Sequence, residues 1–242
     1  MIIPFVASLF YFVLFSEQPF ARGIYAATKV FTVVWPLVCV WVLTDRKFSP
    51  IEILRFAQND NPGEISRQCH PERSEGSLSQ RAQAIFVGIL TGILMAGLMF
   101  VAMKTPLGEV VVAGAQNIRG KMTQLGILEH YWTFTIFLSV IHSLIEEYYW
   151  RWFVYGHLRR LMGIMPALIL GNAAFASHHV VILSEYFPVT WALLFSAAVG
   201  IGGALWCVMF EKQRTLTGAW VSHAIVDFAI MTIGYGILAK DI

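Results

Sequence analysis

Long apolar runs separated by short polar connections make up most of this chain. A helix needs roughly 20 mostly apolar residues to cross the hydrocarbon core of a bilayer, and the runs lack the two-residue alternation of barrel strands. The pattern therefore predicts an all-α, polytopic transmembrane helical bundle of about seven spans. The runs lie near residues 2–15, 24–44, 84–103, 131–157, 164–184, 189–210 and 216–238.

The first run, residues 2–15, fits a membrane span least well. It is shorter than the roughly 20 residues that a span needs, and no basic region precedes its apolar part. No small-residue cleavage site follows it, so it does not have the features of a signal peptide either. Two interpretations stay open for this run, a truncated span and a helix that lies in the membrane interface.

The composition agrees with a protein embedded in a lipid bilayer. Hydrophobic residues make up 57% of the 242 residues and charged residues only 13%, about half the charged share of an average soluble domain. The formal net charge of +2 is too small to indicate a nucleic-acid partner. The three cysteines lie far apart and form no CxxC pair, so they indicate neither a disulfide framework nor a zinc ligand set.

Basic residues gather at every second connection between the later runs. Because Lys and Arg favour the cytoplasmic side of a membrane protein, we expect these connections to be cytoplasmic. The turn 185–188 carries no basic residue and is expected on the opposite side. Segment 104–130 contains Lys104, Arg119 and Lys121, against this pattern, and only alternation of the spans places it there too, as a partly helical surface loop. The cytoplasmic basic residues are Arg46, Lys47, Arg81, Arg159, Arg160, Lys212 and Arg214.

Residues 50–83 form a polar cytoplasmic connection of a different character. The segment contains Pro, Gly and charges of both signs, as flexible loops do. Back-translation allows residues 53–60 to be the reverse complement of residues 70–76 at nearly every nucleotide, as in peptides translated from bacterial intergenic palindromic repeats. The segment is therefore either an in-frame translated palindromic repeat or an ordinary loop with chance complementarity, and neither interpretation gives it a catalytic role.

Three clusters of ionisable residues fall inside the predicted spans. A charged group within a span costs about 3 kcal/mol or more, so each cluster marks a candidate functional site. The stretch "EEYYWR" contains Glu146, Glu147 and Arg151, and the other two clusters are "FASHH" at residues 175–179 and "HAIVD" at residues 223–227.

The spacing within these clusters predicts which side chains cooperate. Glu147 and Arg151 are four residues apart, which predicts an ion pair within one helix. Glu146 is rotated by about 100° from Glu147 and can face the bundle interior. His223 and Asp227 have the same four-residue spacing, so the carboxyl group of Asp227 can orient the imidazole ring.

These parts are sufficient to activate a water molecule in a low-dielectric site. A carboxylate and a histidine from a second helix can act as general base, and His223 can donate to the oxyanion that forms on an attacked amide. The predicted reaction is hydrolysis of a peptide bond inside the membrane. The sequence has no GxSxG motif and no GxGD-type pair of aspartates in its spans, which disfavours rhomboid-like and presenilin-like mechanisms.

The three clusters also match a known set of motifs in the same order. "EEYYWR" fits EExxxR, "FASHH" fits FxxxH through Phe175 and His179, and "HAIVD" fits HxxxN/D. Together they resemble the CPBP family, the CAAX-processing and bacteriocin-processing (Abi) intramembrane proteases related to CAAX prenyl protease type 2. The resemblance covers roughly residues 131–238, the motif-bearing catalytic core of a single membrane domain, 1–242.

This resemblance implies a role for each motif residue. Glu146 and His179 position and activate the attacking water, His223 and Asp227 form the pair on the oxyanion side, and the other two residues of the first motif support the site. Many family members have Asn where this chain has Asp227, which favours an orienting role for this residue over that of a neutral donor.

The family has been described both as metal-dependent and as a metal-independent glutamate protease. The chain has no HExxH motif, and a Glu/His/His zinc site spread over three helices is the alternative to our expectation of no cofactor. Expected partners are the bilayer and a membrane-associated peptide or protein substrate. The suspected repeat points to a bacterial inner (plasma) membrane.

Other functions and other histidines stay under consideration. A proton- or ion-coupled transporter would also use buried Glu, His and Asp, although the chain shows no convincing internal repeat, and a catalytically silent membrane scaffold is a third hypothesis. His178 is interpreted as a neighbour of His179 that points about 100° away, with a one-residue shift of the motif conceivable. His142, one turn before Glu146, either supports the site or packs in the bundle.

Overall fold

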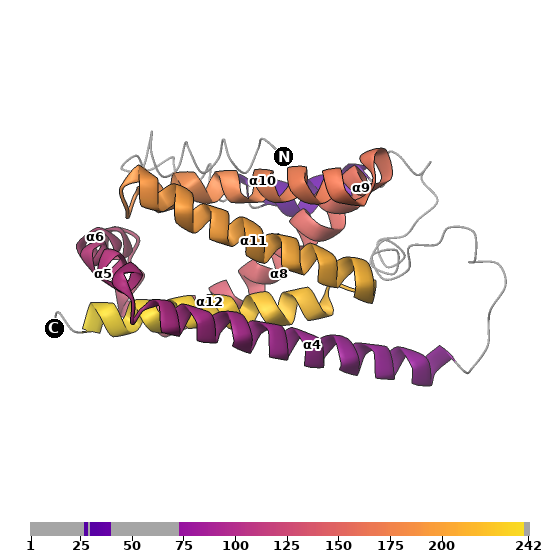
Figure 1. Cartoon of the computed structure of the whole chain (residues 1–242), viewed down its shortest axis with the longest axis horizontal. Helices are drawn as coiled ribbons and strands as arrows, with labels where there is room; N and C mark the ends of the chain where they lie inside the picture. Colours follow the sequence, from indigo (N-terminus) through magenta and orange to yellow (C-terminus); the bar gives the residue numbers. More distant parts are fainter. Residues whose placement is uncertain (1–26, 29, 40–72, 240–242) are drawn as a thin grey trace.

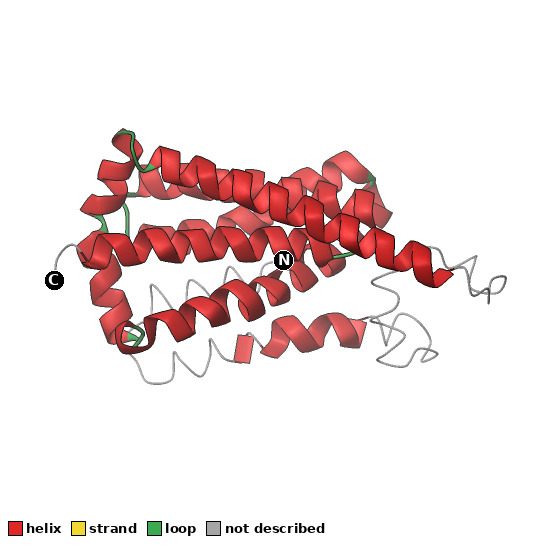
Figure 2. Cartoon of the chain, turned by 90° about the horizontal axis from the view of Figure 1, so that it is seen from below, coloured by secondary structure: helices red, strands yellow, loops and turns green. Residues whose placement is uncertain are grey.

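A computed structural model describes residues 27–28, 30–39 and 73–239 of the chain. Every regular element in these ranges is a helix (Figures 1 and 2), so the predicted all-α fold class is confirmed. The expectations for residues 2–15 and for most of segment 50–83 lie outside the described residues. The elements after residue 72 are α4 (Arg73–Ala102), α5 (Pro106–Ala113), α6 (Ala115–Gln124), η2 (Leu128–His130), α7 (Tyr131–Ile136), η3 (Phe137–His142), α8 (Ser143–Glu147), η4 (Tyr148–Tyr155), α9 (Gly156–Met162), α10 (Ile164–Ser184), α11 (Val189–Gln213) and α12 (Thr217–Leu238).

In the described part of the chain, four helices are long and apolar enough to cross a membrane. They are Leu78–Ala102, Ile164–Ser184, Val189–Gln213 and Thr217–Leu238, and each coincides with a predicted run. The run predicted at 131–157 is helical throughout as well, because α7 to α9 follow one another without a break. A shorter apolar helix, Val30–Cys39, lies within the predicted run 24–44.

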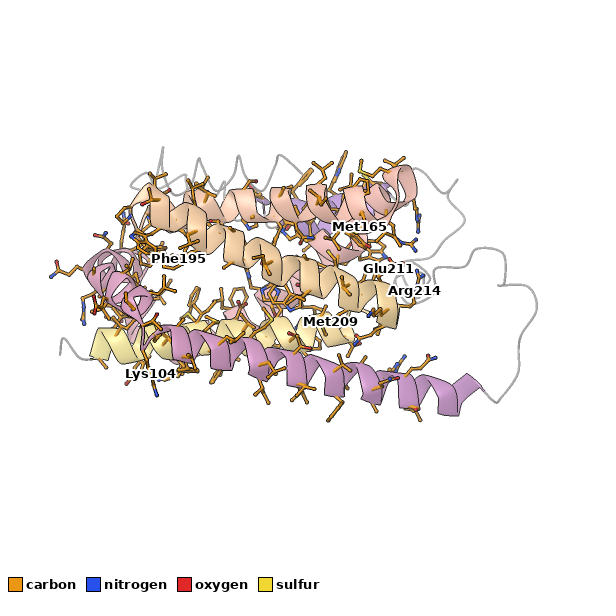
Figure 3. All side chains as sticks on the ribbon, in the orientation of Figure 1. Lys104, Met165, Phe195, Met209, Glu211 and Arg214 are labelled. Carbon is orange, nitrogen blue, oxygen red and sulfur yellow. The ribbon has the colours of Figure 1, made fainter. Side chains whose placement is uncertain are left out.

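The two ends of the bundle are held together by polar contacts. At one end, Glu211 of α11 pairs with Arg159 of α9 and, at 3.4 Å, with Arg214; Glu211 and Arg214 are seen there in Figure 3. At the other end, Lys121 of α6 pairs with Glu185 at 3.5 Å. Segment 104–130 therefore lies at the same end as the turn 185–188, as alternation of the spans predicts, and its helices α5 and α6 appear there in Figure 1.

Helix α4 packs closely along α12, and glycines make this approach possible. A Cβ atom on Gly88 would lie 2.5 Å from the carbonyl oxygen of Gly218, and one on Gly92 would lie 2.9 Å from Cβ of Ile225. Both distances are too short for real side chains. The two helices run parallel, so the contact continues from one turn to the next. Helix α4 therefore holds α12, which carries His223, in position.

A larger side chain at Gly88 is expected to separate α4 from α12. The Gly88→Leu variant should lose about 1–3 kcal/mol of stability, the usual cost of overpacking, because the backbone of Gly218 cannot move aside cheaply. Gly97→Leu is the matched control on the same helix, since nothing lies within 4 Å of the position of its Cβ. Thermal unfolding in detergent measures both, and equal midpoints for the two variants would refute this packing.

The helix that carries the two glutamates is not a uniform α-helix. Two π-helical segments, η3 and η4, flank the short α8 that contains them. A π turn shifts the backbone bonding from i−4 to i−5 and is frequent at functional sites. Side chains contact the carbonyl group of Val140 in η3: Trp220 of α12 donates to it at 2.9 Å, and the hydroxyl of Ser143 lies 3.4 Å away. The hydrogen bond from Trp220 fixes η3 against α12.

Candidate active site

The three polar clusters converge in the interior of the bundle. Helix α8 contributes Glu146 and Glu147, α10 contributes His178, and α12 contributes His223. All four side chains are buried, with exposed fractions of 7%, 0%, 4% and 5%. Burial of this many ionisable groups is costly unless they are paired, so their contacts with one another indicate what the site can do.

Glu147 connects two other members of the cluster. Its Oε2 lies 3.2 Å from Nε of Arg151, which confirms the predicted ion pair within one helix. Its Oε1 lies 2.7 Å from Nδ1 of His223, and because a carboxylate oxygen accepts, Nδ1–H is the donor. Glu147 thereby fixes the imidazole of His223 from a different helix, a contact that residue spacing does not predict.

The second nitrogen of His223 faces two further carboxylates. Nε2 lies 3.5 Å from Oδ1 of Asp227 and 3.9 Å from Oε2 of Glu146. The ring of Trp206 stacks on the imidazole with centroids 4.0 Å apart and an angle of 16°. The predicted four-residue contact with Asp227 is present, but both Glu147 and Trp206 also hold the ring.

Glu146 is surrounded by imidazole rings. Its Oε1 lies 3.7 Å from Nε2 of His178 and 3.8 Å from Nε2 of His142, and its Oε2 faces His223. These separations are longer than direct hydrogen bonds, and a polar contact of this length suits a bridging water. Three imidazole nitrogens therefore surround the carboxylate of Glu146 at distances that a bridging water can span.

The histidine of the FxxxH motif, His179, lies next to this group. Its Nδ1 is 2.9 Å from the carbonyl oxygen of Phe175, so Nδ1–H donates and Nε2 keeps its lone pair. Its ring centroid is 4.1 Å from that of His178. Both histidines of "FASHH" are thus part of the cluster, and it is His178 that comes to within 3.7 Å of Glu146.

A second layer of residues holds Arg151, whose side chain is fully buried. Its guanidinium lies over the rings of Phe175 and Trp206, at 4.3 Å and 5.0 Å from their centroids. A Cβ atom on Gly203 of α11 would lie 3.1 Å from Nη2 of Arg151 and 2.5 Å from Oδ1 of Asn172. Gly203 therefore allows α11 to pack closely against the side chain of this arginine.

Trp150, Trp206 and Asn172 are neighbours of the site that were not predicted from the sequence. Their sequence signals are weak, because tryptophans in this chain also fit interfacial anchoring and a single Asn in an apolar run has no fixed spacing to the motifs. A polar residue inside a span is itself a signal, and Asn172 could have been identified in this way. The two tryptophans are apolar and could be placed only by the structure.

Metal ligation was the open alternative for this cluster. Zinc requires ligand atoms at about 2.0–2.2 Å from the ion. Across the described ranges, no group of three or more His, Cys, Asp or Glu side chains is arranged to hold one metal ion.

Comparison with known proteins agrees with the motifs. Residues 128–229 match the family described as type II CAAX prenyl endopeptidase Rce1-like, and this stretch contains all three clusters. The resemblance inferred from the motifs is confirmed. No curated protein and no solved structure matches the chain.

Proposed function

We propose, from the match of residues 128–229 to the Rce1-like family of type II CAAX prenyl endopeptidases, that this protein is a glutamate-type intramembrane endopeptidase. Its substrate is a membrane-associated peptide or protein, and Glu146 activates the attacking water. One observation carries the proposal: the buried carboxylate of Glu146 has its Oε2 3.9 Å from Nε2 of His223, a distance longer than a direct hydrogen bond. This spacing accommodates a water between helices that are far apart in the sequence.

The proposed reaction begins with attack by this water on the scissile carbonyl carbon. Glu146 accepts one proton from the water as the oxygen–carbon bond forms, which produces a tetrahedral oxyanion. The carbon–nitrogen bond then breaks while Glu146 returns the proton to the leaving nitrogen. The new carboxylic acid gives its proton to the released amine, so water is consumed and no proton is left over.

The residues around Glu146 have separate parts in this proposal. His179, with its lone pair on Nε2, accepts the second hydrogen of the water and orients it. His223, held through Nδ1 by Glu147, stabilises the oxyanion through Nε2–H when both of its nitrogens are protonated. Asp227 favours this protonated form because its carboxylate lies 3.5 Å from Nε2.

We also propose that the hydrolysis needs no metal ion. The support is that Glu146 can accept the proton of the water and that His223, held by Glu147 at 2.7 Å, can stabilise the oxyanion, so no step described above needs a Lewis acid. Treatment with EDTA or 1,10-phenanthroline should leave the hydrolysis rate unchanged, and elemental analysis of the purified protein should find no stoichiometric zinc. Loss of activity on chelation and its recovery with added zinc would reverse this conclusion.

The function is tested with the full chain reconstituted in liposomes. The substrates are a panel of membrane-tethered peptides, some with a prenylated cysteine near the C-terminus and some without, and cleavage products are identified by mass spectrometry. Cleavage of at least one class, lost in the Glu146→Gln variant, is the expected result. Proton flux that depends on Glu146 without any cleavage would overturn the protease proposal and favour the transporter.

A further inference from the structure

Two histidines outside the matched motif positions meet at the same oxygen of Glu146. His142 lies one turn earlier on the same helix, and His178 lies on α10. Their Nε2 atoms are 3.8 Å and 3.7 Å from Oε1 of Glu146. The two rings thus approach the carboxylate from different helices and converge on one of its two oxygens.

The other oxygen of Glu146 has different surroundings. Oε2 lies 3.9 Å from Nε2 of His223, the imidazole assigned to the oxyanion side. The carboxylate is therefore asymmetric, with Oε1 toward His142 and His178 and Oε2 toward His223. A general base needs only one oxygen to accept the proton of the water. The two oxygens of Glu146 can therefore have different functions: one is held in place, and the other accepts the proton.

The ring of His178 is held in place by aromatic neighbours. Trp150 stacks on it with ring centroids 5.4 Å apart and an angle of only 4°, and Phe175 meets it edge-on at 5.5 Å. Trp150 is four residues after Glu146, so it belongs to the same face of the helix. The plane of the imidazole is therefore set by the helix that carries the glutamate.

The hydrogen-bonding capacity of His178 is directed toward Glu146. Its Nδ1 is buried and has no hydrogen-bond partner among the described residues, while Nε2 faces Oε1. A buried imidazole without a use for its polar atoms is costly, and a proton on Nε2 is attracted to the carboxylate 3.7 Å away, directly or through a bridging water. A histidine with a packing role alone would not need its Nε2 to face Glu146.

We propose that His178 and His142 are positioning residues that hold Glu146 through Oε1, so that Oε2 points at the attacking water. The inference rests on the proposed function and deepens it. Anchoring one oxygen stops rotation of the carboxyl group, and a misplacement of about 1 Å in such a site can cost about 10²-fold in rate. A proton-relay role is not needed, because hydrolysis returns the proton of the water to the leaving amine.

The test compares two substitutions at each histidine. Phe keeps a flat ring that can stack on Trp150 but removes the donor, while Gln loses the ring but can place an N–H near the position of Nε2. Positioning predicts that His178→Phe and His142→Phe lower kcat about 10- to 100-fold with little change in KM, and that the Gln variants recover most of it. A packing role predicts the opposite order, with Phe close to the original protein.

Controls in the same assay separate failure of this inference from failure of the proposed function. His157→Phe is the matched control, because His157 bonds the carbonyl of Phe153 on its own helix, away from the cluster, and should keep full activity. Retained hydrolysis in Glu146→Gln would remove the proposed function, and the inference with it. An inactive Glu146→Gln beside fully active Phe variants would overturn the inference alone.

The test does not depend on one variant remaining folded. His178 is buried, and its variants are compared by thermal unfolding before kinetics. His142 is the more exposed of the two, with 19% of its side chain exposed, so its substitution disturbs the bundle less. Unchanged kcat in a folded His142→Phe would by itself refute the two-histidine anchor.

Discussion

Glu146→Gln is expected to lower the rate of peptide hydrolysis by about 10²- to 10⁴-fold, the usual contribution of a general base. Gln has the same shape as Glu but its amide cannot accept a proton from water at neutral pH. Its polar atoms can still meet His142 and His178, which face Oε1 in the original protein. The loss should therefore appear in kcat, while KM and the thermal midpoint stay close to those of the original protein.

A carboxylate elsewhere in the chain serves as the control for this substitution. Glu185 pairs with Lys121 at 3.5 Å at the end of the bundle where α6 lies, so Glu185→Gln removes the same charge without touching the cluster. It should hydrolyse substrate at the original rate. Comparable rates for both Gln variants, measured in liposomes on the same tethered peptide, would remove Glu146 from the role of base.

The contacts that the sequence predicted correctly are those set by local helix geometry. The pair Glu147–Arg151 and the pair His223–Asp227 follow from four-residue spacing, and both are present. The predicted runs that the structure describes are helical as well, because a long apolar segment in lipid has to satisfy its backbone hydrogen bonds internally. In these cases, residue spacing and the length of the apolar runs are enough to predict the geometry.

The contacts that the sequence could not predict depend on how helices rotate against one another. Glu147 and His223 are 76 residues apart, and their 2.7 Å contact exists only because α8 and α12 present these faces to each other. The two π-helical segments contribute to this, since each wide turn alters the rotation of the residues after it. No residue spacing in the sequence signals these turns.

The same limit applies to the two histidines of "FASHH". Adjacent residues on a helix point about 100° apart, so spacing alone cannot say which ring of His178 and His179 reaches Glu146. The structure brings His178 Nε2 to 3.7 Å of that carboxylate and turns His179 Nδ1 to the backbone of Phe175. The rotation of α10, fixed by its packing on α11 and η4, decides this detail.

Glu147→Leu is expected to unfold or strongly destabilise the protein and to abolish hydrolysis. The substitution leaves the guanidinium of Arg151 buried without its counter-charge, and breaking such a pair costs about 3–5 kcal/mol. It also removes the acceptor for Nδ1 of His223. Thermal unfolding in detergent and hydrolysis in liposomes measure the two consequences separately.

Restoring the charge balance separates stability from catalysis at this position. In the double variant Glu147→Leu/Arg151→Met the buried charges disappear together, and replacement of a buried ion pair by apolar residues is often neutral or stabilising. The double variant should therefore regain most of the lost stability. Hydrolysis should remain absent, because the imidazole of His223 still lacks the carboxylate that fixes it.

The outcome for the double variant distinguishes a structural ion pair from a catalytic support. If Glu147 served only to neutralise Arg151, activity would return together with stability once both charges were removed. Glu147→Gln alone gives an independent comparison, because Gln can accept from Nδ1 of His223 but carries no charge to favour its protonated form. Activity between that of the original protein and that of Glu147→Leu is expected for it, since the ring stays oriented while the oxyanion is stabilised less.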